Sequence, residues 1–240
     1  MSFLLAAVVA ASTAFSQGET LDYNLTWMRI SGGTARMTIA PMGEDRFRIT
    51  SVAKSSRSVS RIYRVNDSIE CIVDRGDFST LEYTKKIDER DQKKTEVTTV
   101  ENGVATRVRY KVKKVAVPRP VYDPISIIYH VRTLDLAPGK SHDFKIISDG
   151  KLYDVRARVV KRETLQTPAG TFATVMVEPE MKTVGQERDE RMFIWYSDDQ
   201  RRIPVRIRTE VKFGAVTATL RAISSGVRSI DPPVLRGDVK

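Results

Sequence analysis

The feature that most constrains the fold is a long series of segments in which apolar and polar residues alternate. In the first of them, Leu21, Tyr23, Leu25 and Trp27 fall on one face. A period of two residues is typical of a β-strand with one buried face. The pattern predicts strands over residues 21–27, 34–40, 46–54, 59–73 (one or two strands), 78–88, 92–100, 104–115, 141–147, 151–164, 171–181, 190–197, 203–213 and 214–224.

Turn residues separate these segments, as antiparallel neighbours require. Asn102-Gly103 is the strongest of these signals, because both residues tolerate a positive φ and the pair favours a tight hairpin. Further turns are predicted at residues 31–33, 41–43, 66–67, 149–150, 168–170 and 198–200.

The period changes once, in residues 123–132. Asp123 can cap a helix, and Pro124 suits its first position. Ile128, Tyr129 and Arg132 then recur at helical spacing. We predict one short helix of about 8 to 12 residues, lying on the sheet.

These patterns predict a β-dominated, all-β fold of about 10 to 14 antiparallel strands. The sheet is expected to curve into a half-barrel or open barrel, or to form a two-sheet sandwich, with one short helix near residues 123–132. An α/β arrangement is not expected, because helical segments do not alternate with the strands.

The first residues indicate export. Residues 3–14 are apolar and uncharged, and Ala14-Phe15-Ser16 is a small-x-small cleavage pattern before Gln17. This run is shorter than the ~20 residues of a membrane-spanning helix. It departs from the usual signal in having no Lys or Arg between Met1 and Phe3. We predict a signal peptide over residues 1–16, a single β-rich domain over 17–225 and a flexible C-terminal tail over 226–240.

The rest of the chain predicts a location in the periplasm. No second apolar run reaches transmembrane length, so the mature chain is expected to be soluble, without a transmembrane segment. No cysteine stands directly after the predicted leader, where lipid attachment would need one, so a lipoprotein is not expected. Cys71, the only cysteine, lies in an apolar strand segment and is expected to be a buried free thiol.

Known catalytic and cofactor patterns are missing from the sequence. His130, His142 and Cys71 are too few and too scattered for a zinc site. No glycine-rich phosphate loop and no Gly-x-Ser-x-Gly elbow occurs, and His130 is expected to pack rather than catalyse. We therefore predict no cofactor, no metal and no catalytic residue.

A stretch of alternating cations supplies the candidate binding residues. The formal net charge is +10, which favours anionic partners. Between residues 107 and 113, cations alternate with Val108, Tyr110 and Val112, so a single strand would present one basic face. The candidates for binding an anionic lipid or glycan are Arg107, Arg109, Lys111 and Lys113. The alternative is an ordinary solvated face of a sheet.

Several motifs follow one another in an order that resembles a known family. They are Gly18-Glu19-Thr20-Leu21-Asp22-Tyr23, Ser31-Gly32-Gly33-Thr34-Ala35, Asp123-Pro124-Ile125-Ser126, Arg132-Thr133-Leu134, Pro138-Gly139-Lys140, Thr167-Pro168-Ala169-Gly170-Thr171-Phe172, Ile194-Trp195-Tyr196-Ser197-Asp198-Asp199 and Arg202-Ile203-Pro204-Val205. The chain resembles the exported bacterial family called domain of unknown function 3108, over residues 18–225. The resemblance implies a mostly antiparallel envelope protein and supplies no activity or site residue.

Three functions remain open at this point. The first is an exported, non-enzymatic envelope protein that binds an amphiphilic or anionic ligand, a lipid or glycan, through its curved sheet. The second is an envelope assembly or scaffold protein that docks onto a partner protein. The third is a carboxylate-based hydrolase, since any two of the 30 acidic residues can meet in a fold. Nucleic acid is not an expected partner of an exported protein.

Overall fold

The computed structural model describes residues 15–226, apart from residues 29, 62–63, 91, 183–190 and 213. Within these ranges, 14 strands form one continuous antiparallel sheet, which confirms the predicted fold class. The strands are β1 (Glu19–Trp27), β2 (Ile30–Met42), β3 (Arg46–Ser55), β4 (Asn66–Asp74), β5 (Thr80–Glu89), β6 (Gln92–Glu101), β7 (Val104–Val108), β8 (Val112–Ala116), β9 (Ser141–Ser148), β10 (Lys151–Thr167), β11 (Gly170–Lys182), β12 (Arg191–Ser197), β13 (Pro204–Val211) and β14 (Gly214–Ser225). The described helices are α2 (Arg57–Ser60) and α3 (Ser126–Val131).

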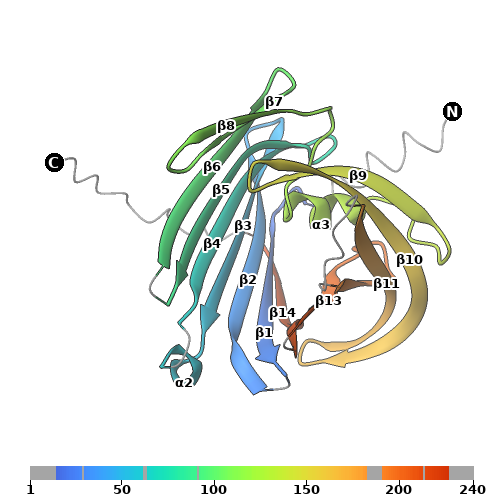
Figure 1. Ribbon diagram of the computed structural model, residues 1–240. Helices are drawn as coiled ribbons and strands as arrows, with labels where there is room; N and C mark the ends of the chain where they lie inside the picture. The colour runs from blue at the N-terminus through green and yellow to red at the C-terminus, as the bar shows by residue number, and fades with distance from the viewer. Residues whose placement is uncertain are drawn as a thin grey trace, which may run out of the picture.

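The first and last strands pair with each other at the centre of the sheet. The order is β8-β7-β6-β5-β4-β3-β2-β1-β14-β13-β12-β11-β10-β9, with Glu19 opposite Ser225 in the β1–β14 register. Figure 1 shows β1–β6 as one wall, β9–β13 curling into the other, and α3 in the space between them. Because all strands belong to one sheet, the open curved sheet is confirmed and the two-sheet sandwich is not the observed form.

A short extended segment connects the two halves on the open side. The Thr80 N–H donates to the Val121 carbonyl (2.9 Å), so residue 121 lies beside β5. Its neighbour Tyr122 pairs with β9, donating to the Lys145 carbonyl (3.0 Å) and accepting from the Ile147 N–H (2.8 Å). These bonds hold β9, the edge strand of the second wall, close to β5 in the first wall.

Helix α3 is positioned by a buried carboxylate that comes before it. Asp123 Oδ1 accepts from the backbone N–H groups of Ile125 (2.8 Å) and Ser126 (2.9 Å), and Oδ2 accepts from Thr80 Oγ1 (2.8 Å). The capping role predicted for Asp123 is therefore confirmed, and its side chain also ties the helix to β5. The helix is shorter than predicted, because residues 124–125 form a turn and the helix begins only at Ser126.

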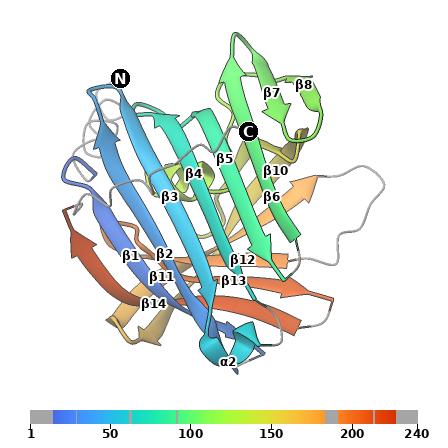
Figure 2. The same cartoon turned by 90° about the vertical axis from the view of Figure 1, so that its left-hand side faces the viewer.

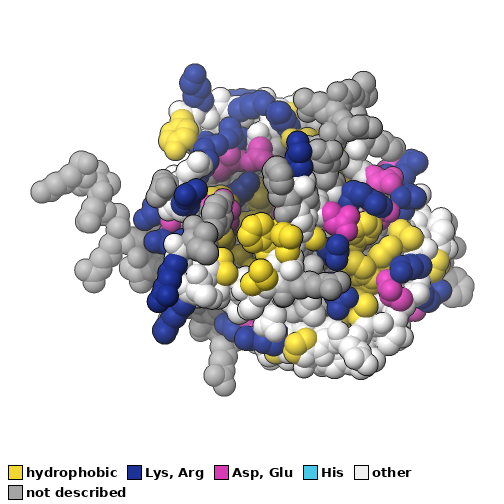
Figure 3. Space-filling view, turned by 60° about the horizontal axis from the view of Figure 1, so that its bottom comes forward, with side chains coloured by type: hydrophobic (Ala, Val, Ile, Leu, Met, Phe, Trp, Pro, Cys, Tyr) yellow, Lys and Arg dark blue, Asp and Glu magenta, His cyan; other side chains and the backbone are white. Residues whose placement is uncertain are grey.

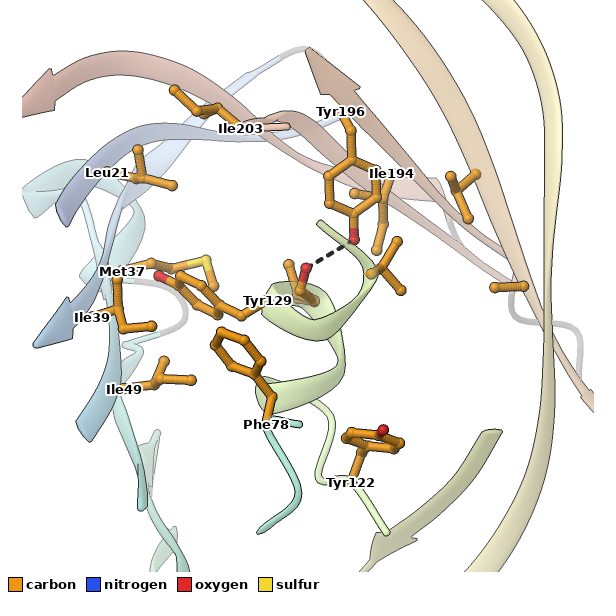
Figure 4. Packing of buried hydrophobic residues seen from close by; sticks show 14 of the residues in the cluster. Leu21, Met37, Ile39, Ile49, Phe78, Tyr122, Tyr129, Ile194, Tyr196 and Ile203 are labelled. Carbon is orange, nitrogen blue, oxygen red and sulfur yellow. Dashed lines mark hydrogen bonds between the residues drawn. The ribbon is translucent and has the colours of Figure 1, made fainter. Parts of the chain in front are cut away.

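The main core surrounds α3 on the concave side of the sheet. Tyr129 is fully buried and faces the apolar side chains of β1–β3, as Figure 4 shows. On the opposite side of the helix, the hydroxyl of Tyr196 on β12 donates to the Ile128 carbonyl (3.3 Å). Both walls therefore pack against the same six-residue helix.

Three local predictions are wrong. The predicted turn at residues 31–33 lies inside β2, and glycine is needed there because a Cβ at Gly33 would lie 2.0 Å from the Lys54 carbonyl oxygen on β3. Within residues 59–73, Asn66 and Asp67 begin β4 rather than forming a turn, and α2 precedes it. Residues 104–115 form a hairpin, β7 and β8, instead of one strand.

The first described residue belongs to the core. The ring of Phe15 is 2% exposed, and its centroid lies 5.6 Å from that of Phe78, 6.0 Å from Tyr129 and 6.1 Å from Phe47. Residues 1–14 of the predicted signal peptide and residues 227–240 of the predicted tail lie outside the described residues. A cleavage before Gln17 would remove the Phe15 ring from the core. None of the described helices is long and apolar enough to span a bilayer.

Candidate ligand-binding site

A cavity of about 950 Å³ lies between α3 and the inner face of β9–β13. Its helix side is formed by Ile128 and Val131, and its sheet side includes Val155, Ala157, Val177 and Ile194. All six of these side chains are buried. The volume falls in the range of small-molecule pockets, and the lining is the apolar kind that holds hydrocarbon.

Strand alternation explains why this inner face is apolar. On β10, Val155 and Ala157 are buried, while Arg156 and Arg158 between and beside them lie on the outer face. Arg156 pairs there with Asp143 (2.8 Å). This strand therefore has one basic face and one apolar face.

Glu178, Glu180 and Arg191 line one end of the cavity. Glu178 on β11 is buried and accepts from Arg158 (2.9 Å) and Arg191 (2.6 Å), while Glu180 and Arg191 are exposed. The β11–β12 ladder ends at Val177, and the described residues beyond it have no ladder partner on β12. Figure 3 shows hydrophobic side chains lying between Lys, Arg, Asp and Glu side chains on one face of the molecule. The cavity thus combines an apolar interior with a charged opening.

The two residues that most resemble reactive groups have structural roles. Cys71 is fully buried, as expected, and its thiol donates to Asp123 Oδ1 (3.1 Å), while burial raises its pKa well above the usual value. The His130 ring stacks on Tyr122 with centroids 4.6 Å apart, and its Nε2 shares a hydrogen bond with the Tyr122 hydroxyl (3.2 Å). Among the described residues, no group of three or more His, Cys, Asp or Glu side chains is placed to hold a metal ion.

The buried imidazole of His130 predicts a loss of stability in acid. Burial lowers the pKa of His130 from 6.5 to about 4, against a weaker opposing effect of Asp77. Between these values the unfolded chain binds a proton that the folded protein excludes, so stability falls as the pH drops from 6.5 toward 4, by about 3 kcal/mol at most.

The variant His130→Phe isolates this contribution. Asp67 acts in the opposite sense over the same range, because burial raises its pKa to about 6. We therefore expect the variant to lose less stability than the parent between pH 7 and pH ~4.5, as measured by urea denaturation. Equal losses in the two proteins would contradict the assignment.

The four sequence-predicted binding residues do not share one strand face. The chain reverses at residues 109–111, so Arg107 on β7 lies directly opposite Lys113 on β8, and Arg109 and Lys111 fall in the turn. Arg107 forms an ion pair with the buried Glu96 (2.5 Å). Val108, Tyr110 and Val112, which were expected to form an apolar face, are exposed instead. Their binding role stays a prediction.

The cavity residues were not predicted as a site, although part of the signal was present. The alternation in β10 and β12 marked Val155, Ala157 and Ile194 as inward-facing. An inward apolar residue can fill a core or line a cavity, and the pattern is the same in both cases. The distinction depends on how far α3 stands from β10 and β11, which is a long-range property.

The fold and the cavity define this protein as an open, curved β-sheet protein with an internal helix and an apolar pocket. The family model described as "Protein of unknown function (DUF3108)" matches residues 22–221, and the chain belongs to this family. The family suggested by the sequence motifs is therefore confirmed.

One solved structure supports the fold, and the fold alone. The β-barrel-like protein of domain of unknown function DUF1849 from Brucella abortus aligns with a TM-score of 0.64 at 9% identity, covering 88% of this chain and 99% of that chain. The hypothetical protein CT021 from Chlamydia trachomatis aligns with a TM-score of 0.41 at 7% identity, covering 92% and 94%. No curated protein matches the chain.

Proposed function

We propose that this protein is an exported, non-enzymatic cell-envelope protein that binds an amphiphile in the cavity between α3 and β9–β13. The observation that carries the proposal is a cavity of about 950 Å³ with buried apolar walls and charged groups at one end. An acyl chain would lie against Val155, Ala157 and Val177, with its polar end near Glu178 and Arg191. The location in the envelope rests on the predicted leader.

The charge arrangement supports a binding role over hydrolysis. Glu178, the buried carboxylate at the opening, is held by two arginines, Arg158 and Arg191. A glycoside hydrolase needs two carboxyl groups facing each other across the substrate, one of them protonated. In Glu178, both carboxylate oxygens instead contact guanidinium groups, Oε1 that of Arg191 and Oε2 that of Arg158.

Filling the cavity is expected to abolish binding without unfolding the protein. Ala157 lies on β10 with its side chain in the cavity, so Ala157→Phe places a ring where the ligand would lie. We expect affinity for a dansylated fatty acid to fall at least ~10-fold, since a bulky group excludes the chain sterically. Fluorescence titration measures the effect.

Val160→Phe is the matched control, because Val160 lies on the same strand and is 39% exposed on the outer face. It should bind as the parent does, and both variants should retain the parent's circular dichroism. Full binding by Ala157→Phe, or no binding by the parent, would contradict the proposal. Native mass spectrometry adds a further test: a tightly held partner chain without an amphiphile would favour the assembly alternative.

A further inference from the structure

The turn of the β7–β8 hairpin exposes an unusual amount of apolar surface. Tyr110 is 79% exposed, Val112 63% and Val108 47%. Val108 and Val112 are direct cross-strand partners, so they form one apolar pair next to the tyrosine in the turn. In Figure 2 this hairpin lies beyond β6 at the edge of the sheet. We call Val108, Tyr110 and Val112 the hairpin patch.

Cations surround the hairpin patch. Residues 102–122 include six Lys or Arg and no Asp or Glu. Lys111, Lys113 and Lys114 are exposed, and none of them forms an ion pair with a described residue. The guanidinium of Arg109 lies over the Tyr110 ring, 5.1 Å from its centroid. Arg107 differs from these four, because its charge is already paired with Glu96.

The base of the hairpin holds the patch in place. The Arg107–Glu96 ion pair joins β7 to β6, with exposed side-chain fractions of 17% and 6%. Beside it, Ala105, Val117 and Ile147 form a small buried cluster between the hairpin and β9. Because these contacts already fix the hairpin, binding does not have to order it, and the entropic cost of binding is lower.

We propose that the hairpin patch docks on the surface of an anionic phospholipid bilayer. Tyr110 and the two valines would enter the interface between head groups and acyl chains, where tyrosine places its ring in apolar and its hydroxyl in polar surroundings. Arg109, Lys111, Lys113 and Lys114 would contact lipid phosphates, as basic residues beside membrane anchors do. A glycan would match the cations and leave the exposed valines without a role.

Vesicle binding tests this proposal independently of ligand binding in the cavity. We expect the protein to sediment with vesicles containing roughly one-third phosphatidylglycerol in about 0.1 M salt, and to stay in solution with neutral phosphatidylcholine vesicles. The triple variant Lys111→Gln, Lys113→Gln, Lys114→Gln should bind at least ~10-fold more weakly. The double variant Tyr110→Ser, Val112→Ser should also lose at least ~10-fold, because apolar insertion is lost.

Two controls separate docking from net charge and test insertion directly. Lys54→Gln, Lys93→Gln, Lys212→Gln removes three exposed cations elsewhere and should bind almost as the parent does. A fluorescent NBD label on Tyr110→Cys reacts at that position alone, since Cys71 is fully buried, and should brighten on anionic vesicles. A label that stays in water, or full binding by Tyr110→Ser, Val112→Ser, would overturn the proposal. Binding to soluble acidic polysaccharide that does not depend on Tyr110 would favour the glycan.

Discussion

Replacing Arg132 with methionine is expected to lower the free energy of unfolding by about 3–5 kcal/mol. The Arg132 side chain is 2% exposed and forms a bidentate ion pair with Glu19, with Nη1–Oε1 and Nη2–Oε2 distances of 2.6 and 3.0 Å. Its Nε and Nη2 also donate to the Arg201 carbonyl, at 3.1 and 2.9 Å. Methionine would fill much of the space and leave the carboxylate of Glu19 without its partner.

The effect is large because Arg132 joins three separate parts of the fold. It follows α3 directly, Glu19 begins β1, and Arg201 lies in the turn between β12 and β13. Both walls are therefore held to the helix through one guanidinium. Loss of that group should loosen α3, which is also a wall of the cavity.

Arg36→Met is the matched control for this measurement. Arg36 forms the same bidentate contact, with Asp22 (2.8 and 3.1 Å), but its side chain is 49% exposed. Exposed pairs contribute about 1 kcal/mol or less, so urea denaturation should separate the two variants clearly. Adding Glu19→Gln to Arg132→Met should recover part of the loss, since no unpaired buried charge then remains. Equal losses in the Arg36 and Arg132 variants would contradict the assigned role.

Much of the fold could be predicted because most strands bury one face. Alternation marked β3 and β10 correctly, and Asn102-Gly103 forms the predicted hairpin turn with φ values of +50° and +75°. The motif beginning at Asp123 indicated the helix because capping is a local interaction. Each of these features depends on neighbours in the sequence, which is why they could be predicted.

The features that were missed depend on contacts between distant segments. From its sequence neighbours, Gly33 was predicted to lie in a turn. Glycine is required at this position because β3 passes so close that a Cβ would collide with its backbone. The alternation of Arg107 to Lys113 suits one strand as well as two short ones, and the reversal is supported by packing against β6 and β9. Arg132 was grouped with Ile128 and Tyr129 by helical spacing, but its partner Glu19 lies 113 residues away and could not be predicted. The candidate cavity was missed for the same reason, because it too depends on contacts between distant segments.

A chain that begins at Gln17 is expected to be less stable than one that begins at Phe15, by about 3 kcal/mol. The Phe15 ring packs edge-on against Phe78 and Tyr129, and the Arg132 guanidinium lies over it, 4.5 Å from its centroid. Deleting the ring removes a buried aromatic side chain and leaves a cavity beside a buried charge. Urea denaturation of the two chains measures the difference, and Phe15→Ala in the longer chain should reproduce it.

The same comparison bears on where the predicted signal peptide would be cleaved. Cleavage after Ser16 discards Phe15, whereas Ser12-Thr13-Ala14 is a second small-x-small pattern whose cleavage would keep it as the first residue. If the ring belongs to the mature core, N-terminal sequencing of exported protein should begin at Phe15. The loss on removing Phe15 should also shrink in the Arg132→Met background, because the two side chains are in contact. Equal stability of the two chains would show that the core does not need Phe15, and would favour cleavage before Gln17.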